Sequence, residues 1–165
     1  MITINTRVRP AVSADATQMA KLINAVIATG GTTAYEDSLD IAYMRHRFIA
    51  PDTNVSCHVA ISNGRMSGFQ SLLWGDDTMP EGWAIIATFV ALDRAQMGIG
   101  QKLFSATRFA AKNAGVKTID ATIRADNIGG LKYYGGLGFT DYNVLHQVPL
   151  RDGTPVDRIR KRLDL

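Results

Sequence analysis

The chain contains 165 residues, of which 46% are hydrophobic and 20% are charged, a balance typical of a single globular domain over residues 1–165. The net charge of +3 and the isoelectric point near 9.2 suit an anionic ligand such as a nucleotide cofactor. Nucleic-acid binding would need a stronger basic patch with aromatic neighbours, and no apolar run approaches the ~20 residues of a membrane span. The one cysteine, Cys57, excludes an internal disulfide, and the first residues lack a signal-peptide pattern, so we expect a cytoplasmic protein.

The first third of the chain predicts one strand and two helices. Residues 7–10 predict the strand, and Asp15 is expected to cap the helix that follows, with Gln18 as its reciprocal partner. This helix should end at Gly30-Gly31. Its apolar face consists of Met19, Leu22, Ile23, Val26 and Ile27. A second helix is expected over residues 38–50. Its core-facing residues are Ile41, Met44 and Phe48.

The rest of the chain predicts strands in hairpins, interrupted by two helices. Asn63-Gly64 is the strongest short-range hairpin signal, and Asp152-Gly153 predicts a second hairpin turn. The strands are expected at residues 55–61, 66–74, 83–92, 116–123, from 139 onward and 156–163, and the helices at 99–114 and 127–137. The almost continuous apolar run of residues 83–92 suits a central strand covered on both faces. This mixed order predicts an α/β fold of the mixed α+β kind, with helices on both faces of one sheet.

The most informative segment is the turn around Gly98 and Gly100, where the apolar run ends and a helix begins at once. Such a turn leaves backbone N–H groups without partners at the positive end of the helix dipole, so it is suited to bind an anion such as phosphate. The alternative is a tight turn that needs a positive φ angle, which explains one glycine better than two.

Two motifs and the order of the elements resemble the GNAT superfamily of acetyl-CoA-dependent N-acetyltransferases over nearly the whole chain. The first motif is Gly98-Ile99-Gly100 with Leu103 after the central strand. The second is Asn127 followed by Tyr133-Tyr134-Gly135-Gly136-Leu137-Gly138-Phe139, which is similar to the family pattern Asn…Tyr-x-x-x-Gly-Phe. Within the superfamily, the phosphinothricin acetyltransferase branch is the most similar, since the segment Thr32-Thr33-Ala34-Tyr35 lies where that branch has a substrate-side loop. The resemblance implies a central mixed, mostly antiparallel sheet flanked by helices on both faces. A homodimer is common among relatives, but no residue of the sequence establishes the oligomeric state.

The resemblance further implies acetyl-CoA as the co-substrate. Backbone N–H groups of the glycine turn would surround its pyrophosphate, and its pantetheine arm would lie along the end of the central strand. Asn127 would bond this arm or cap the short helix. The implied cofactor-binding residues are Phe89, Val90, Leu92, Gln96, Met97, Gly98, Ile99, Gly100, Gln101, Asn127 and Tyr133. Ala95 stands where relatives usually have Gln or Arg, so a side-chain contact to phosphate is lost or supplied by a neighbour such as Lys102. The three scattered histidines have no metal-ligand spacing, so no metal is expected.

Acyl transfer from a thioester expels a thiolate, and the resemblance implies that Tyr134 protonates it as general acid. The Gly-Phe register selects Tyr134 rather than Tyr133; the alternative is a tyrosine that merely packs at a helix end. No general base is assigned, because residues 85–88 contain no carboxylate. Glu81, Glu36 and Asp37 remain candidates acting through water, and an amine of lowered pKa would need no base.

The resemblance therefore implies an enzyme that moves an acetyl group from acetyl-CoA to a primary amine of a small molecule, with an amino acid or analogue as the first choice of acceptor. Direct attack in a ternary complex is expected, since Cys57 and His58 point to opposite faces of a strand and form no catalytic pair. Tyr35 and Trp74 would border the acceptor pocket. Two alternatives stay open: acetylation of a protein N-terminus or lysine, and a non-catalytic acyl-CoA-binding sensor.

Overall fold

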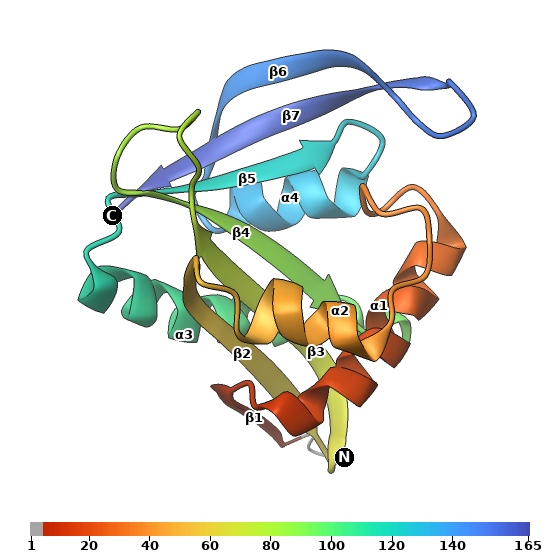
Figure 1. The fold of residues 1–165 in the computed structure, drawn as a ribbon, viewed down its shortest axis with the longest axis vertical. Helices are drawn as coiled ribbons and strands as arrows, with labels where there is room; N and C mark the ends of the chain where they lie inside the picture. Colours follow the sequence, from red (N-terminus) through yellow and green to blue (C-terminus); the bar gives the residue numbers. More distant parts are fainter. Residues whose placement is uncertain (1–4) are drawn as a thin grey trace.

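The computed structural model describes residues 5–165, which form one seven-stranded sheet with helices on both faces (Figure 1). The strands are β1 (Thr6–Pro10), β2 (Asn54–Ser62), β3 (Arg65–Trp74), β4 (Trp83–Val90), β5 (Thr118–Arg124), β6 (Thr140–Pro149) and β7 (Pro155–Asp164). The helices are α1 (Ala16–Thr29), α2 (Ile41–Met44), α3 (Ile99–Ala114) and α4 (Ile128–Gly136), with short helical turns η1 (Ser13–Asp15), η2 (Arg45–Ile49) and η3 (Leu92–Arg94). The strand order is β1-β2-β3-β4-β5-β7-β6, and only the β4–β5 pair is parallel within the described residues. The predicted mixed, mostly antiparallel sheet is confirmed.

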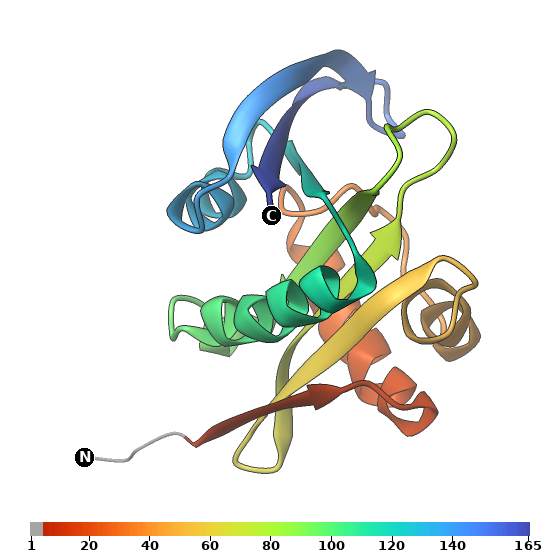
Figure 2. The same ribbon diagram turned by 90° about the vertical axis from the view of Figure 1, so that its left-hand side faces the viewer.

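The helices divide between the two faces of the sheet. Figure 2 shows α1 and α2 on one side and α3 and α4 on the other. Beneath α1 and α2, the rings of Phe48, Phe69 and Phe89 pack with centroids 5.1–6.1 Å apart. Beneath α3 and α4, a second buried cluster joins Phe104 of α3 to Tyr134 and Phe139 at α4. Burial of apolar side chains on both faces fixes the helices against β4 and its neighbours.

The two central strands separate after a short contact. β4 and β5 pair at only three positions, from Trp83↔Thr118 to Ile85↔Asp120. Beyond them, residues 86–90 of β4 pair with β3, and residues 121–124 of β5 pair with β7. Each strand therefore has one unpaired backbone edge within the described chain, and these two edges face the opening between the halves of the sheet.

The predicted capping of α1 is wrong. Asp15 stands at the helix start, but its carboxylate accepts hydrogen bonds from the Arg9 guanidinium at 2.8 and 2.9 Å and from the Val12 N–H at 2.8 Å. The Gln18 Oε1 atom instead accepts from the Met66 N–H of β3 at 3.2 Å. A charged partner on β1 and a free donor on β3 compete with the helix for both side chains, and neither is visible from local spacing.

The second helix is shorter than predicted. It starts at Ile41, because Asp40 is the N-cap and its Oδ1 atom accepts from the Tyr43 N–H at 2.7 Å. Met44 and Phe48 are buried as predicted, but Ile41 is 38% exposed. The remaining predicted strands and helices are confirmed within a few residues, and the helix stops at Gly30 and Gly115 are confirmed as well. None of the helices between residues 5 and 165 has the length and apolar character needed to span a membrane.

Candidate active site

The glycine turn presents a row of free backbone donors. Gln96 and Gly98 have φ angles of 62° and 78°, and Gly98 is the N-cap of α3. The first amide of this helix with a partner is that of Lys102, which donates to the Gly98 carbonyl at 3.2 Å. The N–H groups of residues 96–101 make no hydrogen bond to any part of the chain that the structure describes. Donors that converge at a helix N-terminus are suited to bind an anion.

Gly98 and Gly100 are required in this turn for different structural reasons. A Cβ at Gly98 would meet nothing within 4 Å, so its positive φ angle explains the glycine. A Cβ at Gly100 would lie 2.5 Å from the ring of Tyr133, whose hydroxyl donates to the Gly100 carbonyl at 2.7 Å. The second glycine therefore allows α4 to pack against the start of α3. The two sequence motifs meet at this contact, which neither motif reveals by itself.

A buried network of polar side chains joins β3, β4 and α4. The Tyr134 hydroxyl lies 2.8 Å from the Thr88 Oγ1 atom of β4. Gln70 of β3 is fully buried, and its Nε2 group donates to Thr88 Oγ1 at 2.8 Å and to the Tyr133 hydroxyl at 3.1 Å. Thr88 lies in the part of β4 that β5 has left, so the network stands at the open edge of the sheet. Gln70 and Thr88 were not among the site residues expected from the sequence.

The hydrogen atoms of this network can be assigned from its geometry. Tyr133 gives its only hydroxyl proton to the Gly100 carbonyl, so it must accept from Gln70, and this fixes the amide of Gln70 with Nε2 toward the hydroxyls. Both Nε2 hydrogens are then used, on Tyr133 and Thr88. Between them, Thr88 and Tyr134 carry two hydroxyl protons but share one hydrogen bond. One proton of this pair has no acceptor among the described residues, and it is available to a bound group.

Burial affects the protonation of both tyrosines. It raises the pKa of Tyr133 to about 12, and it raises the pKa of the 7% exposed Tyr134 further, against the lowering effect of the bond to Thr88. Both phenols therefore stay protonated at neutral pH, as a donor to a departing anion must.

The end of β4 combines a buried side-chain face with an open backbone edge. Phe89 packs on Phe48 and Phe69, whereas Val90 packs with Ile99 and its neighbours. Their backbones pair with β3, on the side away from β5. The expectation that the strand extends to Leu92 is wrong, because β4 ends at Val90 and Leu92 lies in η3 with 53% of its surface exposed; its contact with a cofactor stays a prediction. The chain therefore leaves the sheet two residues before the end of the apolar run at residue 92, and the free amides of the turn follow only after η3.

The predicted pocket residues do not lie together. The ring of Tyr35 packs edge-on against Phe48, with 6.4 Å between centroids, on the α1 and α2 face next to the end of β4. Trp74 pairs with Ala84 at the opposite end of the β3–β4 ladder. It is four residues from Gln70 along β3, or about 13 Å at ~3.3 Å per residue. Trp74 packs against the buried cluster that contains Tyr134, whereas Tyr35 packs in the cluster on the other face of the sheet.

Asn127 and two of the three candidate bases, Glu36 and Asp37, are engaged elsewhere. The Asn127 side chain caps α4 by accepting from the Gly130 N–H at 2.9 Å, and it also donates to the Thr32 carbonyl at 3.1 Å. Glu36 accepts from the Arg151 N–H at 3.0 Å, and Asp37 pairs with the Arg151 guanidinium. The structure thus provides the capping role for Asn127 and leaves the general base unassigned.

Cys57 and the histidines do not form a reactive site. Burial raises the pKa of the Cys57 thiol to about 12, which keeps it in the unreactive neutral form. Within residues 5–165, no group of His, Cys, Asp and Glu side chains is arranged to hold a metal ion.

Comparisons with known proteins agree with this geometry. The model of the acetyltransferase (GNAT) family matches residues 22–139. No curated protein sequence matches the chain. Phosphinothricin acetyltransferase from Sinorhizobium meliloti, in complex with acetyl-CoA, superposes with a TM-score of 0.85 at 19% identity, over 97% of this chain and 88% of that one.

Two further solved structures are similar over almost their full length. The protein yncA from Salmonella typhimurium, with its cofactor acetyl-CoA, has a TM-score of 0.80 at 22% identity, over 97% of this chain and 94% of that one. The ribosomal-protein-alanine N-acetyltransferase from Brucella melitensis has a TM-score of 0.83 at 21% identity, over 96% and 99%. At these identities the similarity shows the fold and does not identify the acceptor.

Proposed function

Since the chain belongs to the acetyltransferase (GNAT) family, we propose that it transfers an acetyl group from acetyl-CoA to a primary amine of a small molecule. The observation that carries this proposal is the hydroxyl pair of Thr88 and Tyr134, which holds one proton without an acceptor at the open edge of β4. An amino acid or a close analogue is the first choice of acceptor.

The residues present fit acetyl-CoA. The free N–H groups of residues 96–101 provide several donors at a helix N-terminus for the pyrophosphate. The unpaired backbone edge of residues 86–90 provides donors and acceptors for the amides of the pantetheine arm. Ala95 has no polar side chain that could contact the pyrophosphate, so the main-chain N–H groups of the turn supply most of its hydrogen bonds. When bound, acetyl-CoA supplies the activated acetyl group.

The chain's own residues then orient the reactants and move a proton. We expect a free backbone N–H at the end of β4, such as that of Val90, to polarise the thioester carbonyl. The Tyr134 hydroxyl donates its proton to the departing sulfur. Thr88 bonds that hydroxyl and keeps it in place, and Gln70 in turn bonds Thr88. A direct attack by the amine is favoured over a covalent intermediate, because the pKa of Cys57, the one thiol of the chain, is raised by burial.

The proposal is tested by measuring free thiol release from acetyl-CoA across a panel of primary amines. Turnover on a small-molecule amine supports it. In Tyr134→Phe, which removes one buried oxygen, kcat should fall about 100-fold or more, the range of general acid catalysis, with little change in the KM for acetyl-CoA. Tyr133→Phe is the matched control and should have a smaller effect on kcat, since the Tyr133 proton is already bound to the Gly100 carbonyl.

Three outcomes contradict the proposal in distinct ways. Tight binding of acetyl-CoA without turnover on any amine or peptide would favour a sensor. Turnover on peptides alone would favour a protein acetyltransferase. An unchanged kcat in Tyr134→Phe would show that the general-acid assignment is wrong.

A further inference from the structure

Three polar side chains on the α1 and α2 face take no part in the steps above. They are Tyr35, Tyr43 of α2 and Arg47 of η2, here called the Tyr–Arg cluster. The two tyrosine hydroxyls lie 3.4 Å apart and their rings meet edge to face, with centroids 6.3 Å apart. Burial raises the pKa of Tyr35 to about 12, and the nearby charge of Arg47 acts in the opposite direction. The guanidinium of half-buried Arg47 lies over the ring of Phe48, 5.8 Å from its centroid, and Tyr35 packs against the same ring.

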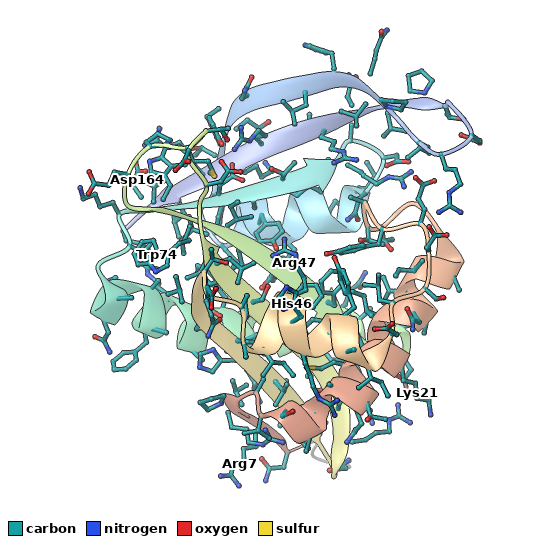
Figure 3. All side chains as sticks on the ribbon, in the orientation of Figure 1. Arg7, Lys21, His46, Arg47, Trp74 and Asp164 are labelled. Carbon is teal, nitrogen blue, oxygen red and sulfur yellow. The ribbon has the colours of Figure 1, made fainter. Side chains whose placement is uncertain are left out.

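The Tyr–Arg cluster lies across β4 from the hydroxyl network. The ring of Tyr35 packs on Phe48, and Phe48 packs on Phe89 of β4 with centroids 6.1 Å apart. Thr88, the preceding residue of β4, points to the opposite face and bonds Tyr134. Figure 3 shows the labelled Arg47 projecting from η2 in front of β4 and in the direction of β5. Since the free amides of the turn are at the start of α3 on the other face, the face of the Tyr–Arg cluster is left for the acceptor.

Three of the acidic groups near this opening are neutralised by an arginine: Asp37 pairs with Arg151, Asp126 with Arg124, and buried Asp120 with Arg160. Glu36 accepts only from the backbone N–H of Arg151 and keeps its charge. Arg47 forms no ion pair with any residue from 5 to 165, although it is half-buried. A guanidinium that is partly removed from water without a counter-ion is stabilised by a ligand carboxylate, which it can bind through two parallel hydrogen bonds.

A second arginine adds to the positive charge at the same opening. Arg158 of β7 is the register partner of Arg124, and it too has no ion pair within the described chain. Arg124 donates to the Thr33 carbonyl at 3.3 Å, two residues before Tyr35. Arg124 of β5 thus connects the strand pair β5–β7 to residues 33–35 beside the Tyr–Arg cluster. The field at this opening favours an anionic group and disfavours a polycation.

We propose that Arg47, together with the hydroxyls of Tyr35 and Tyr43, binds a carboxylate of the acceptor. The acceptor is then an amine that carries a carboxylate, as an amino acid does, rather than a polyamine or a lysine in a basic peptide. This inference rests on the proposed acetyl transfer, because it concerns the acceptor side of the same site. It assigns a specificity-determining role to Tyr43 and Arg47, which the sequence motifs do not include.

The test compares amino acids with their carboxamides as acceptors, for example leucine with leucinamide, in the thiol-release assay. The wild-type protein should prefer the carboxylate of each pair by about 10- to 100-fold in kcat/KM, the range of a charge-assisted hydrogen bond. Arg47→Gln should remove this preference by raising the KM of the carboxylate member, with the KM for acetyl-CoA unchanged. Arg47→Lys should restore part of it, since it keeps the charge but not the planar fork.

Arg45→Gln is the matched control, since Arg45 lies two residues earlier, is exposed, and bonds the Ser13 carbonyl at 3.3 Å. It should keep the wild-type preference. The inference is overturned if the carboxamides are equal or better acceptors for the wild-type protein, a comparison that needs no variant. An equal loss for both members of each pair in Arg47→Gln would also overturn it. Failure of the proposed function looks different, because no amine of either kind would then release thiol.

Discussion

Replacement of Thr88 by valine tests the assignment of hydrogen atoms in the buried network. The two side chains have nearly the same shape, and valine is as suited to a strand as threonine, so β4 should be unchanged. The substitution removes the hydroxyl that lies 2.8 Å from both Gln70 Nε2 and the Tyr134 hydroxyl. Tyr134 then loses its bonded partner at the open edge of the sheet, while its ring stays packed.

The expected magnitude follows from the two bonds that are lost. One of the two buried Nε2 hydrogens of Gln70 then has no partner, which costs about 1–3 kcal/mol of stability. General acid catalysis contributes about 10²–10⁴-fold, and Thr88 acts on it only by positioning Tyr134. We therefore expect kcat to fall about 10-fold, equivalent to ~1.4 kcal/mol in the barrier, with the KM for acetyl-CoA within about twofold of the wild-type value.

The assay is initial-rate thiol release with both substrates saturating, together with urea denaturation to measure the free energy of unfolding. Thr88→Ser is the matched control, because it keeps the hydroxyl and removes the methyl group. It should retain most of the activity. A wild-type kcat in Thr88→Val would refute the reasoning, and an equal loss in both variants would show that the methyl contact, not the hydroxyl, is responsible.

Three further substitutions or measurements test the packing around the site. In Gly100→Ala, a Cβ 2.5 Å from the Tyr133 ring should force α3 and α4 apart and lower the free energy of unfolding by about 1–3 kcal/mol in urea denaturation; an unchanged value would contradict the close packing. Burial raises the pKa of Cys57 to about 12, so an aromatic disulfide reagent at pH 8 should label it only after the protein unfolds, and rapid labelling of the native protein would be inconsistent with this burial. The bond to Arg9 lowers the pKa of Asp15 in the folded protein. The pair therefore stabilises the fold fully above the unfolded-state pKa of ~3.9, and this stabilisation is lost as the pH falls through the lower folded-state pKa. Asp15→Asn should thus lower the free energy of unfolding by about 1–2 kcal/mol at pH 7, a figure discounted because Arg9 is one-third exposed. The variant should also lose less stability than the wild-type protein between pH 7 and pH 3 in denaturation experiments. An equal loss in both proteins would exclude the pair as the source of the acid sensitivity.

The site was only partly predictable from the sequence. Gly98 was found because a positive φ angle at a helix start leaves a local signature. Tyr134 was selected because it precedes Gly138-Phe139 in the motif that resembles the family pattern, and its role as general acid stays a proposal. Gln70 and Thr88 were missed because each is a polar residue within an apolar strand. A polar residue inside an apolar run was the signal that could have revealed each of them. Only the strand register, which pairs Gln70 with Thr88, shows that the two are neighbours.

The sequence by itself determined the strands, the helix stops and the glycine turn, because each depends on neighbours within a few residues along the chain. Hydrophobic period and backbone preference act over that range. The tertiary structure decided where β4 and β5 part, why Gly100 is a glycine, and which side of β4 receives the Tyr–Arg cluster. It also decided that Gln18 accepts from the Met66 N–H of β3 rather than completing the cap of α1. These outcomes depend on contacts between residues far apart in the chain, where steric fit and the pairing of buried polar groups select among partners that local sequence leaves equivalent.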